Sequence, residues 1–90
     1  MNLSGKKINL EVVTPARVIF TGTVDSLTAD AAMGNMGIFP QHAPALALLK
    51  PGFVKYSAAG ASGTFKTSEG FLEISKEKVR IIVESAEAAE

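Results

Sequence analysis

The sequence lacks several residue types on which whole classes of protein depend. It contains no cysteine, no tryptophan, one histidine and one tyrosine among its 90 residues. The lack of cysteine excludes disulfides, zinc–thiolate sites and thiol catalysis, and it favours a reducing compartment for so small a domain. The shortage of tryptophan and tyrosine argues against a sugar site built on stacked aromatic rings.

An excess of charge of either sign is also missing. Nine Lys and Arg residues balance nine Asp and Glu residues, for a formal net charge of zero. Nucleic-acid binding and anchoring to anionic lipid both need a basic excess, so neither is expected. The longest uncharged run, Ala31–Leu49, is broken by glycines and prolines and does not predict a membrane-spanning helix. The first residues show no apolar stretch typical of a signal peptide.

The dominant pattern in the chain is alternation of apolar and polar residues. It is clear at 7–12 and 78–84, where Leu10 and Ile81 each lie at the centre of a regular series of apolar residues. Shorter runs of the same kind occupy 17–21, 23–28, 53–57, 64–67 and 71–74. Short strands separated by glycine and proline turns predict an all-β sandwich or barrel.

The chain is long enough for one domain only. We expect a β-sandwich domain over 1–86 and a short Ala/Glu tail at 87–90. The tail has helix-forming residues but is too short to be stable as an isolated helix. It is therefore expected to be a frayed end, or the first turn of an element that is absent.

One segment, Asp30–Lys50, departs from the alternation and holds two of the three methionines and the only histidine. Met33, Met36, Ile38 and Phe39 lie close together within it. Methionine adapts to irregular partner surfaces, so an exposed loop of this kind is typical of an interaction site. The alternative is that these side chains close one end of the sandwich, and the sequence leaves both open.

No constellation for catalysis or for metal or cofactor binding is present in the sequence. His42 has no ionisable residue beside it and is expected to bond backbone carbonyls or to lie at an interface. The spacings Gly34-x-x-Gly37 and Gly60-x-x-Gly63 lack the helix and the lysine of a phosphate loop. Glycines that permit turns explain them better. No catalytic, cofactor or metal residue is therefore assigned.

The run Gly34-Asn35-Met36-Gly37-Ile38-Phe39-Pro40-Gln41-His42-Ala43-Pro44, with Leu46 and Lys50-Pro51-Gly52 after it, resembles a known signature. It is similar to the G-x-L-G-I-x-P-x-H-A-P-L…K-P-G block of the epsilon subunit of F-type ATP synthase. The opening Leu10–Pro15 and the later Gly70–Ile74 and Val79–Val83 also fit that family. The P-x-H-A-P block is the specific part, and the likeness runs over about 7–86.

The resemblance implies a flattened sandwich of about ten short strands, the amino-terminal domain of epsilon. Because this sequence stops at Glu90, no carboxy-terminal helical domain is expected. The resemblance implies a non-catalytic subunit of the central stalk, or rotor, which attaches the gamma subunit to the c-ring and couples proton transport to ATP synthesis. Such a subunit is peripheral, on the cytoplasmic face of the bacterial plasma membrane or the stromal face in a plastid. It neither inserts into the membrane nor binds nucleic acid, and no nucleotide is expected on this chain.

The resemblance also assigns contact residues. Those implied for gamma are Thr14, Pro40, His42, Ala43, Pro44 and Leu46, and those implied for the c-ring are Ala31, Ala32, Met33, Gly34, Asn35 and Met36. Asn35-Met36 departs from the usual Glu-Leu, and Gln41 stands where the family has glycine. Most bacterial members continue into a helical hairpin that inhibits ATP hydrolysis, and since Glu90 ends this sequence, no such inhibition is expected.

Two other classes of function make different predictions for this sequence. A free-standing β-sandwich module that binds a peptide or a small ligand predicts a concave pocket with convergent polar groups. An enzyme needs a constellation that one histidine and scattered carboxylates do not supply.

Overall fold

The computed structural model describes residues 7–89, which form nine β-strands and no helix. The expectation of an all-β sandwich is confirmed, with nine strands in this range and one of them, β5, unusually long. The strands are β1 (Ile8–Val13), β2 (Val18–Val24), β3 (Ser26–Ala31), β4 (Gly34–Ile38), β5 (Ala45–Ala58), β6 (Ala61–Thr67), β7 (Gly70–Ser75), β8 (Lys78–Val83) and β9 (Ala86–Ala89).

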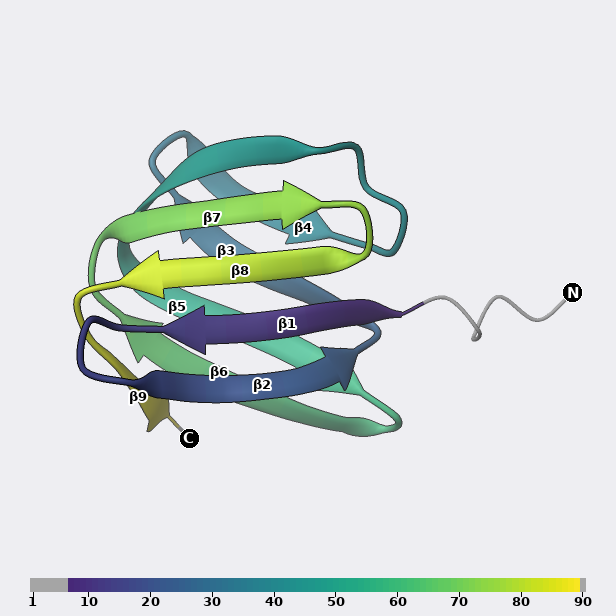
Figure 1. Cartoon of the computed structure of the whole chain (residues 1–90), viewed down its shortest axis with the longest axis horizontal. Helices are drawn as coiled ribbons and strands as arrows, with labels where there is room; N and C mark the ends of the chain where they lie inside the picture. Colours follow the sequence, from purple (N-terminus) through teal and green to yellow (C-terminus); the bar gives the residue numbers. More distant parts are fainter. Residues whose placement is uncertain (1–6, 90) are drawn as a thin grey trace, which may run out of the picture.

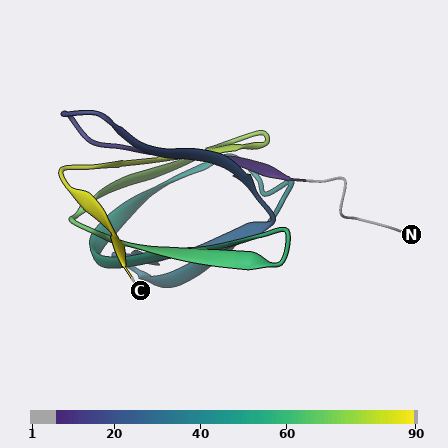
Figure 2. The same cartoon turned by 90° about the horizontal axis from the view of Figure 1, so that it is seen from below.

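The strands form a single sheet that folds over on itself into two layers (Figures 1 and 2). The front layer in Figure 1 has the order β2-β1-β8-β7 and then the first half of β5. The back layer contains β4, β3, the second half of β5, β6 and β9. β1 and β8 run parallel, and the other paired strands run antiparallel. Because β5 is fourteen residues long, it passes from one layer to the other and joins them.

The core lies between the layers and is built by the period-two pattern. Leu10 and Ile81, at the centres of the two clearest alternating segments, are completely buried. Alternate residues of a strand point to opposite faces, so each alternating segment contributes one row to the core and one to the outside. The buried apolar side chains are those of Ile8, Leu10, Val12, Val24, Leu27, Ala29, Ala31, Ile38, Leu49, Val54, Phe65, Leu72, Ile74, Val79, Ile81 and Val83.

β5 bends between its two halves, and Asp30 holds the bend. The pairing of β3 with β5 is interrupted at Asp30, where residues 50–53 bulge away from the ladder. The Asp30 carboxylate accepts hydrogen bonds from the Phe53 N–H at 2.9 Å and from Asn35 Nδ2 at 3.1 Å. A Cβ atom on Gly52 would lie 2.5 Å from this carboxylate, so the bend requires glycine there. The carboxylate thus replaces part of the interrupted ladder.

The structure differs from the sequence expectations at two places. Asp30–Lys50, expected to be a loop, contains β4 and the first half of β5. The expected frayed end instead forms β9, which pairs antiparallel with β6 from Thr67↔Ala86 to Thr64↔Ala89. Pairing with the β6 edge outweighs the helix propensity of alanine and glutamate, since tertiary context overrides local preference. Residues 1–6 and Glu90 lie outside the described residues.

Candidate functional site

The outer face of the front layer carries a row of apolar side chains. Register pairs Leu48 with Phe71, Phe71 with Ile82, Ile82 with Val13, and Val13 with Val18. These five residues, one from each strand of the layer, form what we call the apolar row. Leu48 is 58% exposed and Phe71 46%, although both are large and apolar. Contiguous exposed apolar surface with a polar border is typical of a protein interface.

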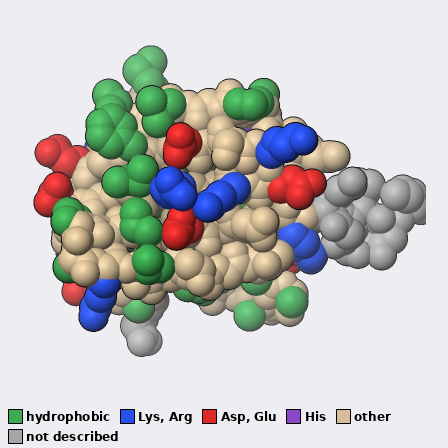
Figure 3. Space-filling view, in the orientation of Figure 1, with side chains coloured by type: hydrophobic (Ala, Val, Ile, Leu, Met, Phe, Trp, Pro, Cys, Tyr) green, Lys and Arg blue, Asp and Glu red, His purple; other side chains and the backbone are tan. Residues whose placement is uncertain are grey.

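A charged row lies beside the apolar row on the same face. Register places Glu73 opposite Arg80, and Arg80 opposite Glu11. Arg80 Nε donates to Glu11 Oε1 at 2.9 Å, and Lys78 Nζ lies 3.7 Å from the same oxygen. Figure 3 shows the charged side chains across the middle of the face and the hydrophobic ones gathered to the left. The face therefore changes from apolar at one end of the strands to charged and polar toward the other.

Leu46 continues the apolar surface along β5. It lies opposite Glu73, two residues before Leu48 on the same face, and it is 70% exposed. Thr14 directly follows Val13 in the tight β1–β2 turn, where its N–H donates to the Arg17 carbonyl at 2.9 Å. These two residues, both implied as gamma contacts, therefore border the apolar row.

The other implied gamma contacts lie at the opposite end of the front layer. Pro40, His42, Ala43 and Pro44 belong to the connection between β4 and β5, which leads into Ala45. Across the sheet, Ala45 pairs with Ile74, Ile74 with Val79, and Val79 with Leu10 in the first half of β1. Thr14, by contrast, follows the end of β1. The structure therefore does not bring Thr14 beside His42. A contact with both requires a partner that covers the length of the face.

His42 has a structural contact within its own loop. Its Nδ1 donates to the Ala43 carbonyl oxygen at 2.7 Å, which agrees with the expectation of a histidine that bonds backbone carbonyls. The preceding residue, Gln41, has φ of 68°, a left-handed conformation that favours glycine. The glycine that the resemblance implies at this position thus matches the backbone that the structure shows.

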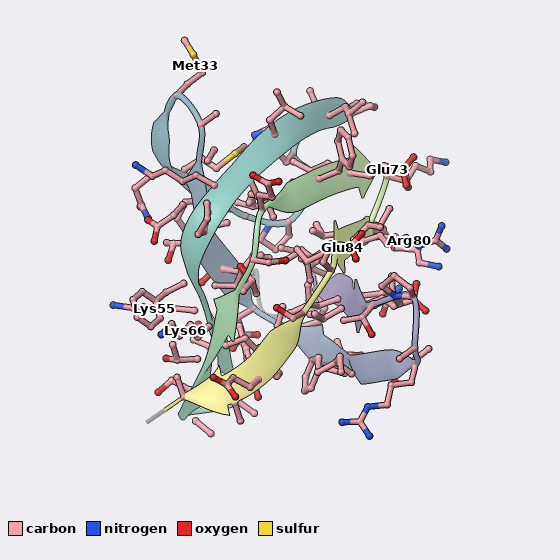
Figure 4. All side chains as sticks on the ribbon, turned by 90° about the vertical axis from the view of Figure 1, so that its left-hand side faces the viewer. Met33, Lys55, Lys66, Glu73, Arg80 and Glu84 are labelled. Carbon is pink, nitrogen blue, oxygen red and sulfur yellow. The ribbon has the colours of Figure 1, made fainter. Side chains whose placement is uncertain are left out.

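The residues implied for the c-ring form the hairpin of β3 and β4. Met33 lies in the turn, is 99% exposed and points away from the body of the molecule (Figure 4). Ile38, further along β4, is completely buried, whereas Phe39 after it is exposed. The two alternatives for this segment, core packing and contact with a partner, therefore apply to different residues. Ile38 closes the sandwich, whereas the exposed side chain of Met33 is accessible to a partner.

A groove of about 530 Å³ separates this hairpin from the first half of β5. It brings together all six residues implied for the c-ring and one implied for gamma, and none of its lining residues is charged. The lining residues are Ala31, Ala32, Met33, Gly34, Asn35, Met36, Leu46, Ala47 and Leu48.

The titratable groups with shifted pKa values fix turns in the fold. The N–H of Phe53, with help from Asn35, lowers the pKa of Asp30. An ion pair with Lys7 and the N–H of Ala59 lower the pKa of Asp25. Within residues 7–89 no group of three or more His, Cys, Asp or Glu side chains could hold a metal ion.

The glycine pairs singled out in the sequence have mixed roles. Gly34 and Gly60 have φ of 128° and 84°, so both permit turns, as expected. Gly63 instead lies in β6 beneath the ring of Tyr56, where a Cβ atom would come within 2.5 Å of the ring. That ring packs beside Phe20 and Phe65, at centroid distances of 5.0 and 6.1 Å.

The sequence interpretation missed most of the apolar row. A signal for it is present in β8, where Ile82 occupies the polar phase of the alternation, in line with Lys78 and Arg80. Val13 breaks the polar phase of β1 in the same way, following Asn9 and Glu11. Apolar residues in the outward phase of several neighbouring strands form a contiguous exposed surface, which is typical of a protein interface.

The described part of the chain holds no helix long and apolar enough to cross a membrane. A family model described as "ATP synthase, Delta/Epsilon chain, beta-sandwich domain" matches residues 7–89. The ATP synthase epsilon chain of Geotalea daltonii is 38% identical over 85 residues, which are 94% of this chain and 62% of that relative. The chain thus spans about three fifths of the length of the curated relatives it matches.

Two solved structures share the fold. A chain of the Euglena gracilis mitochondrial ATP synthase, in a structure of OSCP, F1 and c-ring, has a TM-score of 0.87 and 22% identity, covering 92% of this chain and 54% of that one. A chain in the central stalk and c-ring structure of Tetrahymena thermophila ATP synthase has a TM-score of 0.75 and 19% identity, covering 91% and 66%. With the family model matching almost the whole described range, this chain belongs to the family of ATP synthase delta/epsilon chains and has the fold of their β-sandwich domain.

Proposed function

We propose that the chain is a non-catalytic subunit of the central stalk of an F-type ATP synthase. It attaches the gamma subunit to the c-ring and so helps to couple proton transport to ATP synthesis. Family membership supports this role, and the observation that carries it is the apolar row, an exposed surface suited to a protein partner. The proposed location is peripheral, on the cytoplasmic face of a bacterial plasma membrane or its stromal equivalent.

The gamma subunit is proposed to cover the outer face of the front layer. The apolar row, Leu46 and Thr14 supply the contact at one end of the strands, and the Pro40–Pro44 loop borders the face at the other. Strands of five to seven residues give this face a length of about 20 Å. That length suits an interface of standard size, about 800 Å² for each partner.

The turn of the β3–β4 hairpin is the proposed contact with the c-ring. Met33, in this turn, projects from the sandwich (Figure 4). The Ala32 N–H donates to the Leu48 carbonyl, so the turn lies at the same end of the strands as the apolar row. One subunit can therefore contact gamma with its face and the c-ring with its turn. Among the residues that line the groove between them, Asn35 alone has a polar side chain, so the groove lacks the convergent polar groups of a small-ligand site.

Binding to purified gamma subunit tests the proposal. The chain should form a 1:1 complex at micromolar concentration, seen as co-elution in size-exclusion chromatography. Leu46→Asp and Phe71→Asp should each weaken the complex about 100-fold, because each buries an unpaired carboxylate in the interface.

Ser62→Asp is the matched control. Ser62 is an exposed residue of β6 in the back layer, and its replacement adds the same charge away from the proposed interface. It should leave the affinity unchanged. If the wild-type chain and gamma do not associate, or if all three variants bind equally well, the proposed contact is wrong.

A further inference from the structure

The first half of β5 is an edge strand of the front layer. On one side it pairs with β7, from Ala45↔Ile74 to Leu49↔Gly70. On the other side the register with β3 begins only at Leu49, and one more backbone bond joins the Ala32 N–H to the Leu48 carbonyl at 2.8 Å. Figure 1 shows this half of β5 along the upper border of the layer, with β7 below it. Within the described residues, 45–47 therefore have no strand on that side.

The backbone of Leu46 faces this open side. In an antiparallel strand the N–H and the C=O of one residue point to the same side, and successive residues alternate. The Leu48 carbonyl points toward β3, so Leu46, two residues earlier, presents its N–H and C=O in the same direction. Neither group meets a strand in the part of the chain that the structure describes. These two groups are a template for one further strand.

The surroundings define what such a strand must be. Natural edges are commonly protected by short length, charged side chains, bulges or prolines. Ala45–Leu48 itself contains no charge, bulge or proline, while Pro44 precedes it and the bulge at 50–53 follows it. The adjoining groove of about 530 Å³ is lined without a charged residue, and Met33, Met36 and Leu48 supply apolar side chains. A charged segment would lose hydration there without gaining a partner. The site therefore fits an extended, uncharged segment with apolar side chains.

We propose that an extended, uncharged segment of the gamma subunit adds to the open edge of β5 as a further strand. Its backbone pairs with the N–H and C=O of Leu46, and its apolar side chains pack against the β5 side of the groove, at Leu46 and Leu48, which leaves the Met33 turn to the c-ring. The inference rests on the proposed function, because gamma is the partner whose interface already reaches Leu46. It adds a specific mode of contact, strand addition, in which backbone pairing gives affinity and the groove gives specificity.

Leu46→Pro tests the backbone pairing directly. Proline removes the N–H that the added strand needs, and it is tolerated on an edge where that N–H has no partner within the chain. Leu46→Ala is the matched control, because it removes a comparable side chain and keeps the N–H. Leu46→Pro should weaken gamma binding about tenfold more than Leu46→Ala does. Equal affinities of the two variants would overturn strand addition while leaving gamma binding itself intact.

Hydrogen exchange of the unmodified chain gives a second test that needs no variant. The Leu46 amide should exchange quickly in the free chain and at least about tenfold more slowly in the complex with gamma. A complex that forms and leaves this amide unprotected overturns the inference. Protection of Leu46 in the chain alone, at concentrations where sedimentation shows a dimer, also overturns it, because the edge then pairs with a second copy. Absence of any complex refutes the proposed function instead.

Discussion

At the bend of β5, the carboxylate of Asp30 accepts a backbone hydrogen bond that a neighbouring strand would otherwise accept. It accepts the Phe53 N–H where the ladder between β3 and β5 is interrupted, and this bond is the main cause of its lowered pKa. Since the folded pKa lies below the ordinary value of 3.8, the charged form contributes stability above that pH. The contribution is lost as the pH falls through the lowered pKa of the folded chain.

Asp30→Asn should therefore lower the free energy of unfolding by about 1 kcal/mol at neutral pH, because a bond to a charged acceptor becomes a bond to a neutral one. The difference from wild type should shrink when urea unfolding is repeated at successively lower pH, below 3.8. Glu69→Gln, at an exposed turn residue, controls for the loss of one negative charge. A difference that stays constant to the lowest pH would contradict this role for the carboxylate.

Individual residues were predicted unevenly from the sequence. For His42, the lack of ionisable neighbours argued against catalysis and left a structural or an interface role, and the structure shows a bond to a backbone carbonyl. The left-handed Gln41 could not be deduced from its own residue type, because the usual marker of that conformation is glycine. Ile82 and Val13 were visible in the sequence as apolar residues in a polar phase, but register was needed to place them in one row.

At the scale of elements, regular alternation was sufficient to predict those strands that keep one face buried. It predicts β1, β7 and β8 correctly, whereas it predicts a loop for the first half of β5. Pro51 and Gly52 lie in the middle of this strand, and both normally argue against a central strand. The structure accommodates them because β5 changes layers there, and Asp30 replaces the missing ladder bond. Such a bend depends on a contact distant in sequence.

β9 depends on the side chain of Ser68 as well as on β6. The Ser68 hydroxyl oxygen accepts hydrogen bonds from the N–H groups of Glu84 and Ser85, at 3.0 and 3.1 Å, where the chain crosses from β8 to β9. The Ser68 N–H also donates to the Ser85 carbonyl at 3.0 Å. The alanines of β9 bury little apolar surface, so this corner contributes much of what holds the strand.

Ser68→Ala should cost about 1 kcal/mol of stability, because two N–H groups lose their acceptor. The loss should be local: amide exchange in Ala86–Ala89 should accelerate while that in β1 and β8 stays slow. Ser62→Ala, in the same layer but at an exposed site, should change neither. Uniform acceleration across all strands would show that Ser68 supports the whole sandwich and not this corner.

At the scale of the whole molecule, the two-layer sandwich separates two contact surfaces on one rigid body. The apolar row and the Met33 turn lie at the same end of the strands but belong to different elements. The back layer presents Lys55 and Lys66 outward, away from the face with Glu73 and Arg80 (Figure 4). Strands packed on a common core cannot move independently, which suits the proposed role of a subunit that transmits torque by attachment.

Met33→Ser should reduce the coupling of ATP hydrolysis to proton pumping without lowering the stability of the fold. Met33 is 99% exposed, so its replacement should leave the melting temperature unchanged. In a reconstituted ATP synthase it should reduce proton pumping driven by ATP hydrolysis, because the turn would lose the apolar contact proposed with the c-ring. Met33→Leu keeps the apolar bulk and should retain pumping. A fall in melting temperature with pumping unchanged would show that the turn serves folding and not coupling.

The most direct test of the rotor role is a map of amide exchange in the chain, free and within a complex of gamma and the c-ring. The account predicts slower exchange in the first half of β5, in β7 and β8 and in the Met33 turn, with Lys55, in the second half of β5, and Lys66, in β6, unchanged. Protection confined to the back layer, or no protection anywhere, would contradict it.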